Sequence, residues 1–149
     1  MPILRALVAS FAMATLGCSS TSVAPHVDYD AATAQPTPST WHPGTVWKFQ
    51  AQLRHGKARS WTFRVSAEDA KTCVSGHWRK LELLDGSIGT AGEASYLVEG
   101  QFLWVQLAGN WCDIGHDFRG RLSESGFAGA YTASQGWTYT APIIGHPVQ

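Results

Sequence analysis

The stretch that decides the fold is Thr45–Ala67, which reads TVWKFQAQLRHGKARSWTFRVSA. Apolar and polar side chains alternate in both halves of this stretch, around a short turn signal at His55-Gly56-Lys57. Successive side chains of a β-strand point to opposite faces, so this alternation on both sides of a turn predicts a β-hairpin. The apolar members of the two halves are Trp47, Phe49, Ala51, Leu53, Trp61, Phe63, Val65 and Ala67.

The same alternation continues to the end of the chain. Further strands are expected at Cys73–Leu84 (with a bulge at Gly76), Tyr96–Glu99, Phe102–Leu107, Trp111–Ile114, Phe118–Leu122, Phe127–Ala133 and Trp137–Ala141. Pro142 and Pro147 are expected to end the regular structure. Consecutive hairpins of about eight short strands predict an all-β antiparallel meander that closes into an up-and-down β-barrel, because closure removes the strand edges. A two-sheet β-sandwich is the alternative.

The composition limits the classes of function. The chain has 149 residues, which suits one folded domain, and its 11 Lys and Arg balance its 11 Asp and Glu. A formal net charge of zero argues against nucleic acid as the main partner, because binding to phosphates needs a basic face. Aromatic residues make up 11% of the chain, and a composition with so many large apolar side chains excludes a disordered protein.

The beginning of the chain has the layout of a secretory signal. Arg5 precedes an apolar stretch at Ala6–Leu16, and small residues follow. The stretch is too short for a stable transmembrane helix, which needs about 20 residues.

The end of this segment, Thr15-Leu16-Gly17-Cys18, resembles the lipobox of bacterial lipoproteins. The resemblance implies cleavage before Cys18, acylation of its sulfur and, with Ser19 next, an anchor in the outer membrane with the domain in the periplasm. The alternative is ordinary signal cleavage that leaves Cys18 unmodified. Residues 19–40 hold four Ser, four Thr, four Ala and three Pro, a composition that predicts a flexible tether. The predicted organisation is a signal peptide at 1–17, lipidated Cys18 with a tether to residue 40, and a β-barrel at 41–149.

The cysteine count agrees with export. Acylation would use Cys18 and leave Cys73 and Cys112, which are expected to form a disulfide in an oxidising compartment. Both lie in segments of the form C-x-x-G-H, so a Cys₂His₂ metal site with His77 and His116 is one alternative, and two free thiols are another. The disulfide is preferred, and no metal or other cofactor is predicted.

Catalytic motifs are missing from the sequence. It contains no G-x-S-x-G, no H-E-x-x-H and no Gly-rich phosphate loop, which predicts a protein that is not an enzyme. A hydrolase that uses His116 and Asp117 is the catalytic alternative. Asp113, His116 and Asp117 could form an acid–base group or a metal corner, but a polar turn between strands is the preferred interpretation. If the protein binds its ligand through loops, the candidates are this loop, Asp113–Asp117, and a second loop, Asp85–Glu93.

Aromatic side chains form the other candidate site. Indole and phenol rings can line a ligand cavity, or they can fill the interior of a small barrel. The candidates for a cavity are Trp47, Trp61, Trp104, Tyr131 and Trp137.

The predicted barrel resembles small secreted barrels of the lipocalin-like and bacterial lysozyme-inhibitor kinds. The resemblance and the expected address predict an outer-membrane lipoprotein that is non-enzymatic and binds a protein or an envelope ligand, in the manner of an inhibitor or immunity protein. Its expected partners are the membrane, through the lipid, and a periplasmic protein. The alternatives are a carrier with an apolar ligand in the barrel and a purely structural envelope protein.

Overall fold

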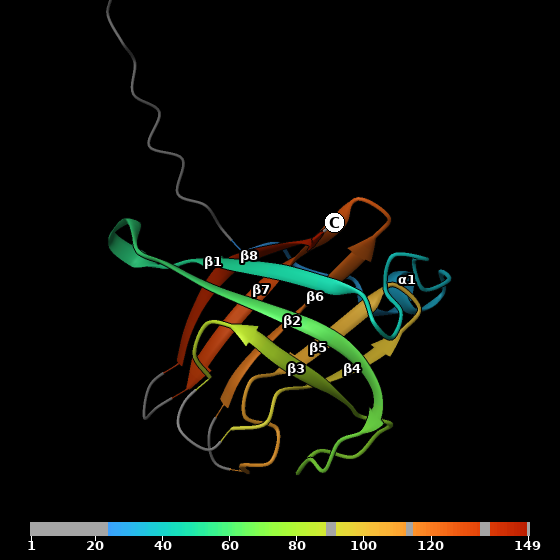
Figure 1. Cartoon of the computed structure of the whole chain (residues 1–149). Helices are drawn as coiled ribbons and strands as arrows, with labels where there is room; N and C mark the ends of the chain where they lie inside the picture. Colours follow the sequence, from blue (N-terminus) through green and yellow to red (C-terminus); the bar gives the residue numbers. More distant parts are fainter. Residues whose placement is uncertain (1–23, 89–91, 113–114, 135–137, 149) are drawn as a thin grey trace, which may run out of the picture.

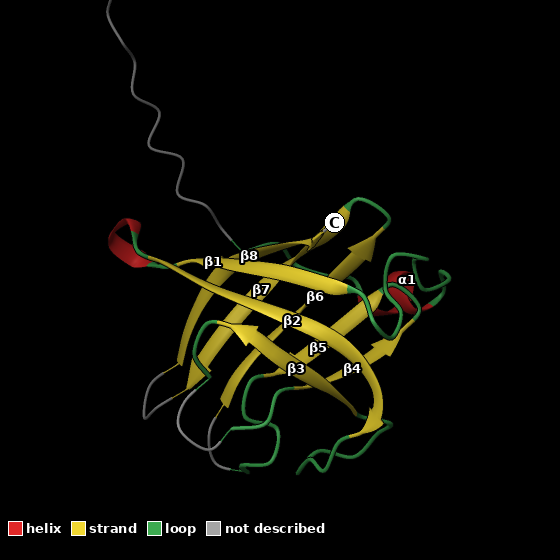
Figure 2. Ribbon diagram, viewed as in Figure 1, coloured by secondary structure: helices red, strands yellow, loops and turns green. Residues whose placement is uncertain are grey.

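The computed structural model describes residues 24–88, 92–112, 115–134 and 138–148. Within them, eight strands account for most of the regular structure (Figure 2). The strands are β1 (Val46–Gln52), β2 (Ala58–Asp69), β3 (Arg79–Asp85), β4 (Ser95–Glu99), β5 (Phe102–Gln106), β6 (Gly115–Ser123), β7 (Gly126–Ser134) and β8 (Thr138–Val148). A short α-helix, α1 (Tyr29–Thr33), precedes them, and a 3₁₀ turn, η1 (Arg54–Gly56), joins β1 to β2.

The strands form one closed antiparallel barrel in chain order, with β8 paired back to β1 (Figure 1). The predicted up-and-down barrel is therefore confirmed. The deciding hairpin forms as its alternation predicts, with Phe49 opposite Trp61 and both side chains buried. Buried positions are apolar along most of the wall, with Ser95 on β4 as a polar exception, which is the pattern expected of a closed sheet with one wet face.

Two predicted strands differ in extent from the observed ones. Of the expected strand Cys73–Leu84, the structure has β3 from Arg79 onward, and Cys73 lies in the loop before β3, where it is bonded to Cys112. No separate strand forms at Trp111–Ile114: Trp111 and Cys112 belong to the loop before β6, and residues 113 and 114 lie outside the described residues.

The two prolines of the last strand do not end the regular structure, contrary to the expectation. β8 continues to Val148 through Pro142 and Pro147. Pro142 pairs with β7 but lies outside the ladder with β1, and Pro147 pairs with β1 but lies outside the ladder with β7. Proline has no N–H to donate to a neighbouring strand. Each of these prolines has one side without a paired strand, so its nitrogen can face that side without the loss of a ladder hydrogen bond.

The segment 28–40, expected to be part of a flexible tether, is instead folded against one end of the barrel. Asp28 caps α1, and its Oδ1 accepts a hydrogen bond of 3.1 Å from the Ala31 N–H. The Tyr29 ring meets the Phe102 ring edge-on, with centroids 4.8 Å apart. The Tyr29 hydroxyl also donates to Glu99, and the Gln101 N–H donates to the Ala32 carbonyl.

The small residues of this segment explain the wrong prediction. Ala32 is 1% exposed, and its carbonyl lies against the turn between β4 and β5. Gly100 in that turn has φ +56°, and a Cβ there would lie 2.3 Å from the Gln35 carbonyl oxygen. Alanine-rich composition therefore reflects close packing at this place and not only flexibility. We call residues 28–40 the cap.

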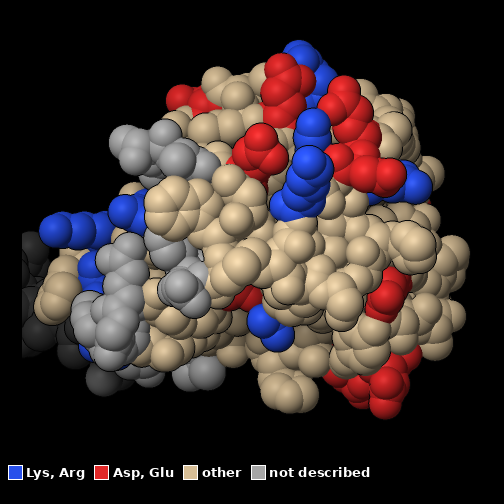
Figure 3. Space-filling model, turned by 90° about the horizontal axis from the view of Figure 1, so that it is seen from below, with Lys and Arg blue, Asp and Glu red and all other residues tan. Residues whose placement is uncertain are grey.

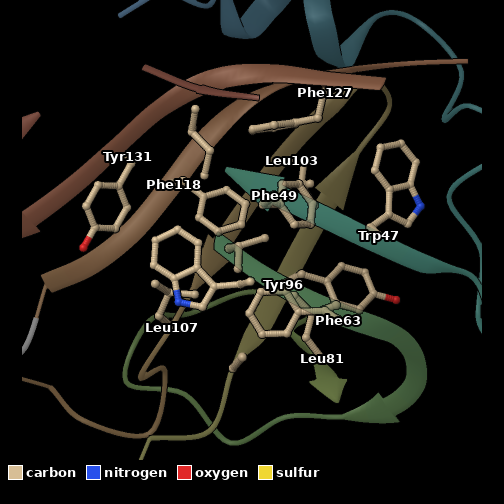
Figure 4. Close-up of a cluster of buried hydrophobic side chains, with 14 of the residues drawn as sticks. Trp47, Phe49, Phe63, Leu81, Tyr96, Leu103, Leu107, Phe118, Phe127 and Tyr131 are labelled. Atoms are coloured by element: carbon tan, nitrogen blue, oxygen red, sulfur yellow. The ribbon is translucent and has the colours of Figure 1, made fainter. Parts of the chain in front are cut away.

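Aromatic rings from most of the wall form much of the core, together with aliphatic side chains such as Leu81 and Leu103 (Figure 4). Phe49 lies near its middle, with its centroid 4.8 Å from Phe118 and 5.5 Å from Phe127. Trp61 lies 5.4 Å from Tyr131 toward one end. Because these rings contact one another, they leave no room for a ligand among them.

No helix in the described part of the chain is both long and apolar enough to pass through a membrane.

Candidate functional site

The outer face of β5 and β6 carries a polar and aromatic cluster. Trp104 lies opposite Arg119, and Gln106 lies opposite Asp117. All four side chains point outward, because the residues that alternate with them, such as Val105 and Phe118, are buried in the core. Trp104 therefore lies outside the barrel, which corrects its expected place in an internal cavity.

The loop between β2 and β3 reaches this face and is fastened there. The Sγ atoms of Cys73 and Cys112 lie 2.03 Å apart, which confirms the predicted cysteine pair. The Cys73 N–H donates to the Gly109 carbonyl at 3.2 Å, and the Trp78 ring meets Trp104 edge-on at 5.0 Å. The disulfide thus joins two loops that are 39 residues apart into one wall beside the cluster.

A hollow of about 280 Å³ lies between this wall and the two strands. We call it the disulfide groove. Its lining residues are Cys73, Val74, Trp104, Gln106, Ala108, Trp111, Cys112, Gly115, His116, Asp117 and Arg119. Trp111 is 49% exposed, which is a large exposed area for an indole. Seen from below, the described surface mixes acidic and basic side chains, and no patch of a single sign covers it (Figure 3).

Asp117 organises the polar side of the disulfide groove. Its Oδ2 accepts hydrogen bonds of 2.8 Å from Trp104 Nε1 and 2.8 Å from Arg119 Nε. The Arg119 guanidinium carbon lies 3.8 Å from the centroid of the Trp104 ring, a cation–π contact. The Asp117 side chain is 14% exposed and that of Arg119 is 54% exposed. The pair therefore holds a fixed carboxylate and a partly exposed guanidinium side by side, with their charges opposed.

His116 lines the disulfide groove and is also hydrogen-bonded to Tyr131, on the inner side of β6. Its Nδ1 lies 3.1 Å from the Tyr131 hydroxyl, and Arg59 Nη1 donates to that hydroxyl at 3.5 Å. Burial lowers the pKa of His116, the charge of Arg59 lowers it further, and Asp117 opposes the shift. Burial also raises the pKa of Tyr131. Neighbouring strand residues point to opposite faces, and accordingly His116 is hydrogen-bonded to Tyr131 whereas Asp117 is hydrogen-bonded to Trp104 and Arg119.

The residues expected to line a cavity do not share one site. Trp47, Trp61 and Tyr131 lie in the core and contact other rings. Trp137, like Asp113 of the expected binding loop and the lipid-attachment residue Cys18, lies outside the described residues. The structure does bring together Trp104, His116 and Asp117, which the sequence assigned to separate candidates.

Of the second candidate loop, Asp85–Glu93, residues 89–91 lie outside the described residues, and Ile88, Gly92 and Glu93 line another hollow of about 380 Å³. It forms because β3 pairs with β4 only at Arg79↔Tyr96 and Lys80↔Ser95, so the two strands diverge beyond that point. Its floor is apolar, with Leu81 and Leu83, and its rim carries Glu68, Lys80, Glu82 and Glu93. Lys80 is already paired with Glu68 at 3.1 Å, and both side chains are well solvated.

The cysteines pair with each other, so they do not form the alternative Cys₂His₂ site. Among the described residues there is no group of three or more His, Cys, Asp or Glu side chains placed to hold a metal ion.

Sequence reasoning did not find Gln106, Trp111 or Arg119 as members of the disulfide groove, nor Trp78, whose ring packs on Trp104 beside it. Gln106 and Arg119 carry a usable signal, since both alternate with buried residues and so must face outward. Gln106 and Arg119 come to the same site because of the register of β5 against β6, and Trp78 and Trp111 because of the disulfide. Neither the register nor the disulfide geometry can be predicted from the local sequence pattern.

Comparison with known proteins finds no family model, no curated protein and no solved structure that matches this chain.

Proposed function

We propose that this chain is a non-enzymatic binding protein of a bacterial cell envelope, anchored by a lipid on Cys18, that holds its ligand in the disulfide groove. The observation that carries the proposal is the Cys73–Cys112 pair beside the groove. Disulfides persist in exported proteins and are rare in the cytosol. The pair therefore supports two parts of the proposal: that the protein is exported, and that the loops lining the groove are held in place before the ligand binds.

The beginning of the chain supports the address. An apolar stretch after Arg5 and the lipobox-like sequence that ends at Cys18 are the features that direct a bacterial protein to lipidation and export. An acylated cysteine with several buried chains would hold the domain at the membrane, at about 0.8 kcal/mol per buried CH₂ group. The outer membrane, with the domain in the periplasm, is the location that the residue after Cys18 favours.

The chemistry of the disulfide groove suits recognition more than catalysis. Asp117 Oδ2 already accepts hydrogen bonds from Trp104 and Arg119, so this carboxylate holds those two side chains in place. His116 hydrogen-bonds on the opposite face. The groove offers fixed polar groups and aromatic surface, and rigid placement of such groups lowers the entropy cost of binding.

The ligand is a protein of the periplasm or a component of the envelope. A barrel that presents loops on a rigid wall is suited to inhibitor-like or immunity-like binding. The alternative of an apolar carrier has less support, because Phe49, Phe118 and Phe127 fill the middle of the described interior.

Metabolic labelling with radioactive palmitate tests the anchor. We expect label on the wild-type chain in the membrane fraction and none on the Cys18→Ala variant. An unlabelled wild-type precursor, dissolved in the cytosol, would contradict the proposal.

Retention of envelope components on the immobilised full chain tests the groove. We expect Asp117→Ala and Arg119→Ala to lower retention at least tenfold. Lys48→Ala, an exposed position on β1, is the matched control and should leave retention unchanged. Equal retention by all the variants would place the binding surface elsewhere and overturn the assignment of the groove.

A further inference from the structure

We infer that the disulfide groove binds a neutral sugar ring, as one unit of a glycan. This inference rests on the proposed function, because it names the chemical class of the ligand for the same groove. It is carried by the combination of an exposed indole, a fixed carboxylate and a neutralising guanidinium in one small hollow.

The indole supplies the apolar half of the site. Trp111 lines the groove and is 49% exposed, although burying an indole contributes strongly to stability. A sugar ring presents a face of C–H groups that packs on a flat aromatic surface while its hydroxyl groups point sideways. Rigid aromatic rings bind such faces with little loss of side-chain entropy.

The strands supply the polar half. Each sugar hydroxyl both donates and accepts, so its site needs acceptors and donors at short spacing. Asp117 accepts, the exposed part of Arg119 donates, and Gln106, directly opposite Asp117 on β5, does both. Because Asp117 is already oriented by Trp104 and Arg119, its position is fixed before the ligand arrives.

The charges select against ions. An anionic ligand such as a phosphate would gain from Arg119 but would meet the Asp117 carboxylate, which lies 2.8 Å from Arg119 Nε. A cationic ligand would meet the opposite conflict. The opposed pair therefore gives no net attraction to either sign, and a neutral polyhydroxylated group is the ligand that uses both members.

The size of the groove agrees with one ring. A volume of about 280 Å³ lies just below the range of sites for drug-sized molecules, which runs from roughly 300 to 1,000 Å³. One ring of an oligosaccharide fits this space, with its neighbours extending over the surface. An envelope protein would meet such chains in the cell wall and in surface glycans.

Titration calorimetry of the full chain with neutral trisaccharides tests the inference. The probes are the trimers of N-acetylglucosamine, glucose in α-linkage and glucose in β-linkage, with glycerol 3-phosphate and spermidine as ionic comparators. We expect at least one trisaccharide to bind with a dissociation constant near or below about 1 mM, and neither ion to bind at that concentration. Trp111→Ala and Asp117→Asn should each weaken the binding at least tenfold.

Ile144→Ala is the matched control, because Ile144 is an exposed apolar residue on β8, 58% exposed and outside the groove. It should bind as wild type does, and near-ultraviolet circular dichroism should verify that every variant is folded. The inference is overturned if no trisaccharide binds at about 10 mM, or if Trp111→Ala and Asp117→Asn bind as tightly as wild type.

The two failures are distinguishable. If the trisaccharides fail while retention of envelope components still depends on Asp117 and Arg119, the sugar is wrong and the groove remains the binding site. If retention is also independent of both residues, the proposed function of the groove fails with it.

Discussion

His116 and Gly100 are single residues whose surroundings set measurable properties of the protein. His116 lies between the core and the groove, with Tyr131 on its inner side and Asp117 next to it in the chain. Gly100 lies where the cap touches the barrel. Neither contact can be predicted from the neighbouring sequence, and each gives a testable prediction for a single side chain.

Stability should depend on the protonation of His116. Burial first, and then Arg59, hold its pKa in the folded chain below the ordinary value of 6.5. Below pH 6.5 the unfolded chain binds a proton that the folded chain refuses, so the free energy of unfolding falls as pH decreases from 6.5 toward the folded pKa. Urea unfolding between these limits should show a shallower slope with pH in His116→Gln. An unchanged slope would mean that other groups carry the dependence.

Gly100→Ala should destabilise the contact between cap and barrel. The new Cβ would be 2.3 Å from the Gln35 carbonyl oxygen, in addition to the strain of φ +56°. Gly44→Ala is the matched control, because it has φ +94° with nothing within 4 Å of the Cβ. We expect about 1–2 kcal/mol loss in Gly44→Ala, from backbone strain, and a larger loss in Gly100→Ala, measured by denaturant unfolding. Equal losses would show that the cap moves away from the new Cβ without a further loss of stability.

At the scale of elements, the cap and β8 are the parts where composition misled. The cap is rich in Ser, Thr, Ala and Pro, and β8 contains two prolines, yet both are ordered parts of the fold. In each case the neighbours decide. The cap covers Phe102, which is 8% exposed, and β8 lies between two strands that require hydrogen bonds from it only over part of its length.

Deleting the cap should therefore weaken the barrel. A chain that lacks the cap, residues 28–40, exposes Phe102 and loses the hydrogen bonds from Ser39 to Glu124. We expect the free energy of unfolding to fall by about 2–3 kcal/mol, on the order of the value for one large apolar side chain. Deleting only residues 24–27, which precede the helix cap Asp28, should change little. A cap deletion with wild-type stability would restore the prediction of a tether.

At the scale of the whole molecule, the closed wall, the ring core and the disulfide hold the groove in place. The wall fixes which residues of β5 and β6 meet, and the core keeps that register by burying Val105 and Phe118. The disulfide adds a long-range constraint between loops that the wall does not connect. We therefore expect the loss of one constraint to affect ligand binding in the groove and the stability of the fold to different degrees.

Replacing both Cys73 and Cys112 by Ala should lower the free energy of unfolding by roughly 3–4 kcal/mol, the chain-entropy value for a loop of this length. Denaturant unfolding of the double variant, compared with wild type with and without reductant, measures this loss. Reductant should destabilise wild type and leave the double variant unchanged. A wild type that is insensitive to reductant would contradict the role given to the disulfide.

Phe118→Ala should cost about 3–5 kcal/mol, because it removes a fully buried ring that contacts Phe49, Trp61 and Phe127. Ile144→Ala, on the wet face of β8, should stay within about 0.5 kcal/mol of wild type. Thermal unfolding of the two variants compares them. Similar losses in both would mean that the ring core is not the main source of stability.

The sequence alone determined the fold class, the strands around the deciding hairpin and the pairing of the cysteines. Alternation and turn residues are local properties, and two cysteines that remain in one chain have a single intramolecular pairing. The signal and lipid attachment at Cys18 stay predictions. Tertiary structure decided that the cap is ordered, that β8 passes through its prolines, and that Trp104 lies outside the barrel beside Asp117 and Arg119. These depend on strand register and on contacts between distant segments, whose free energies arise only when the chain is closed on itself.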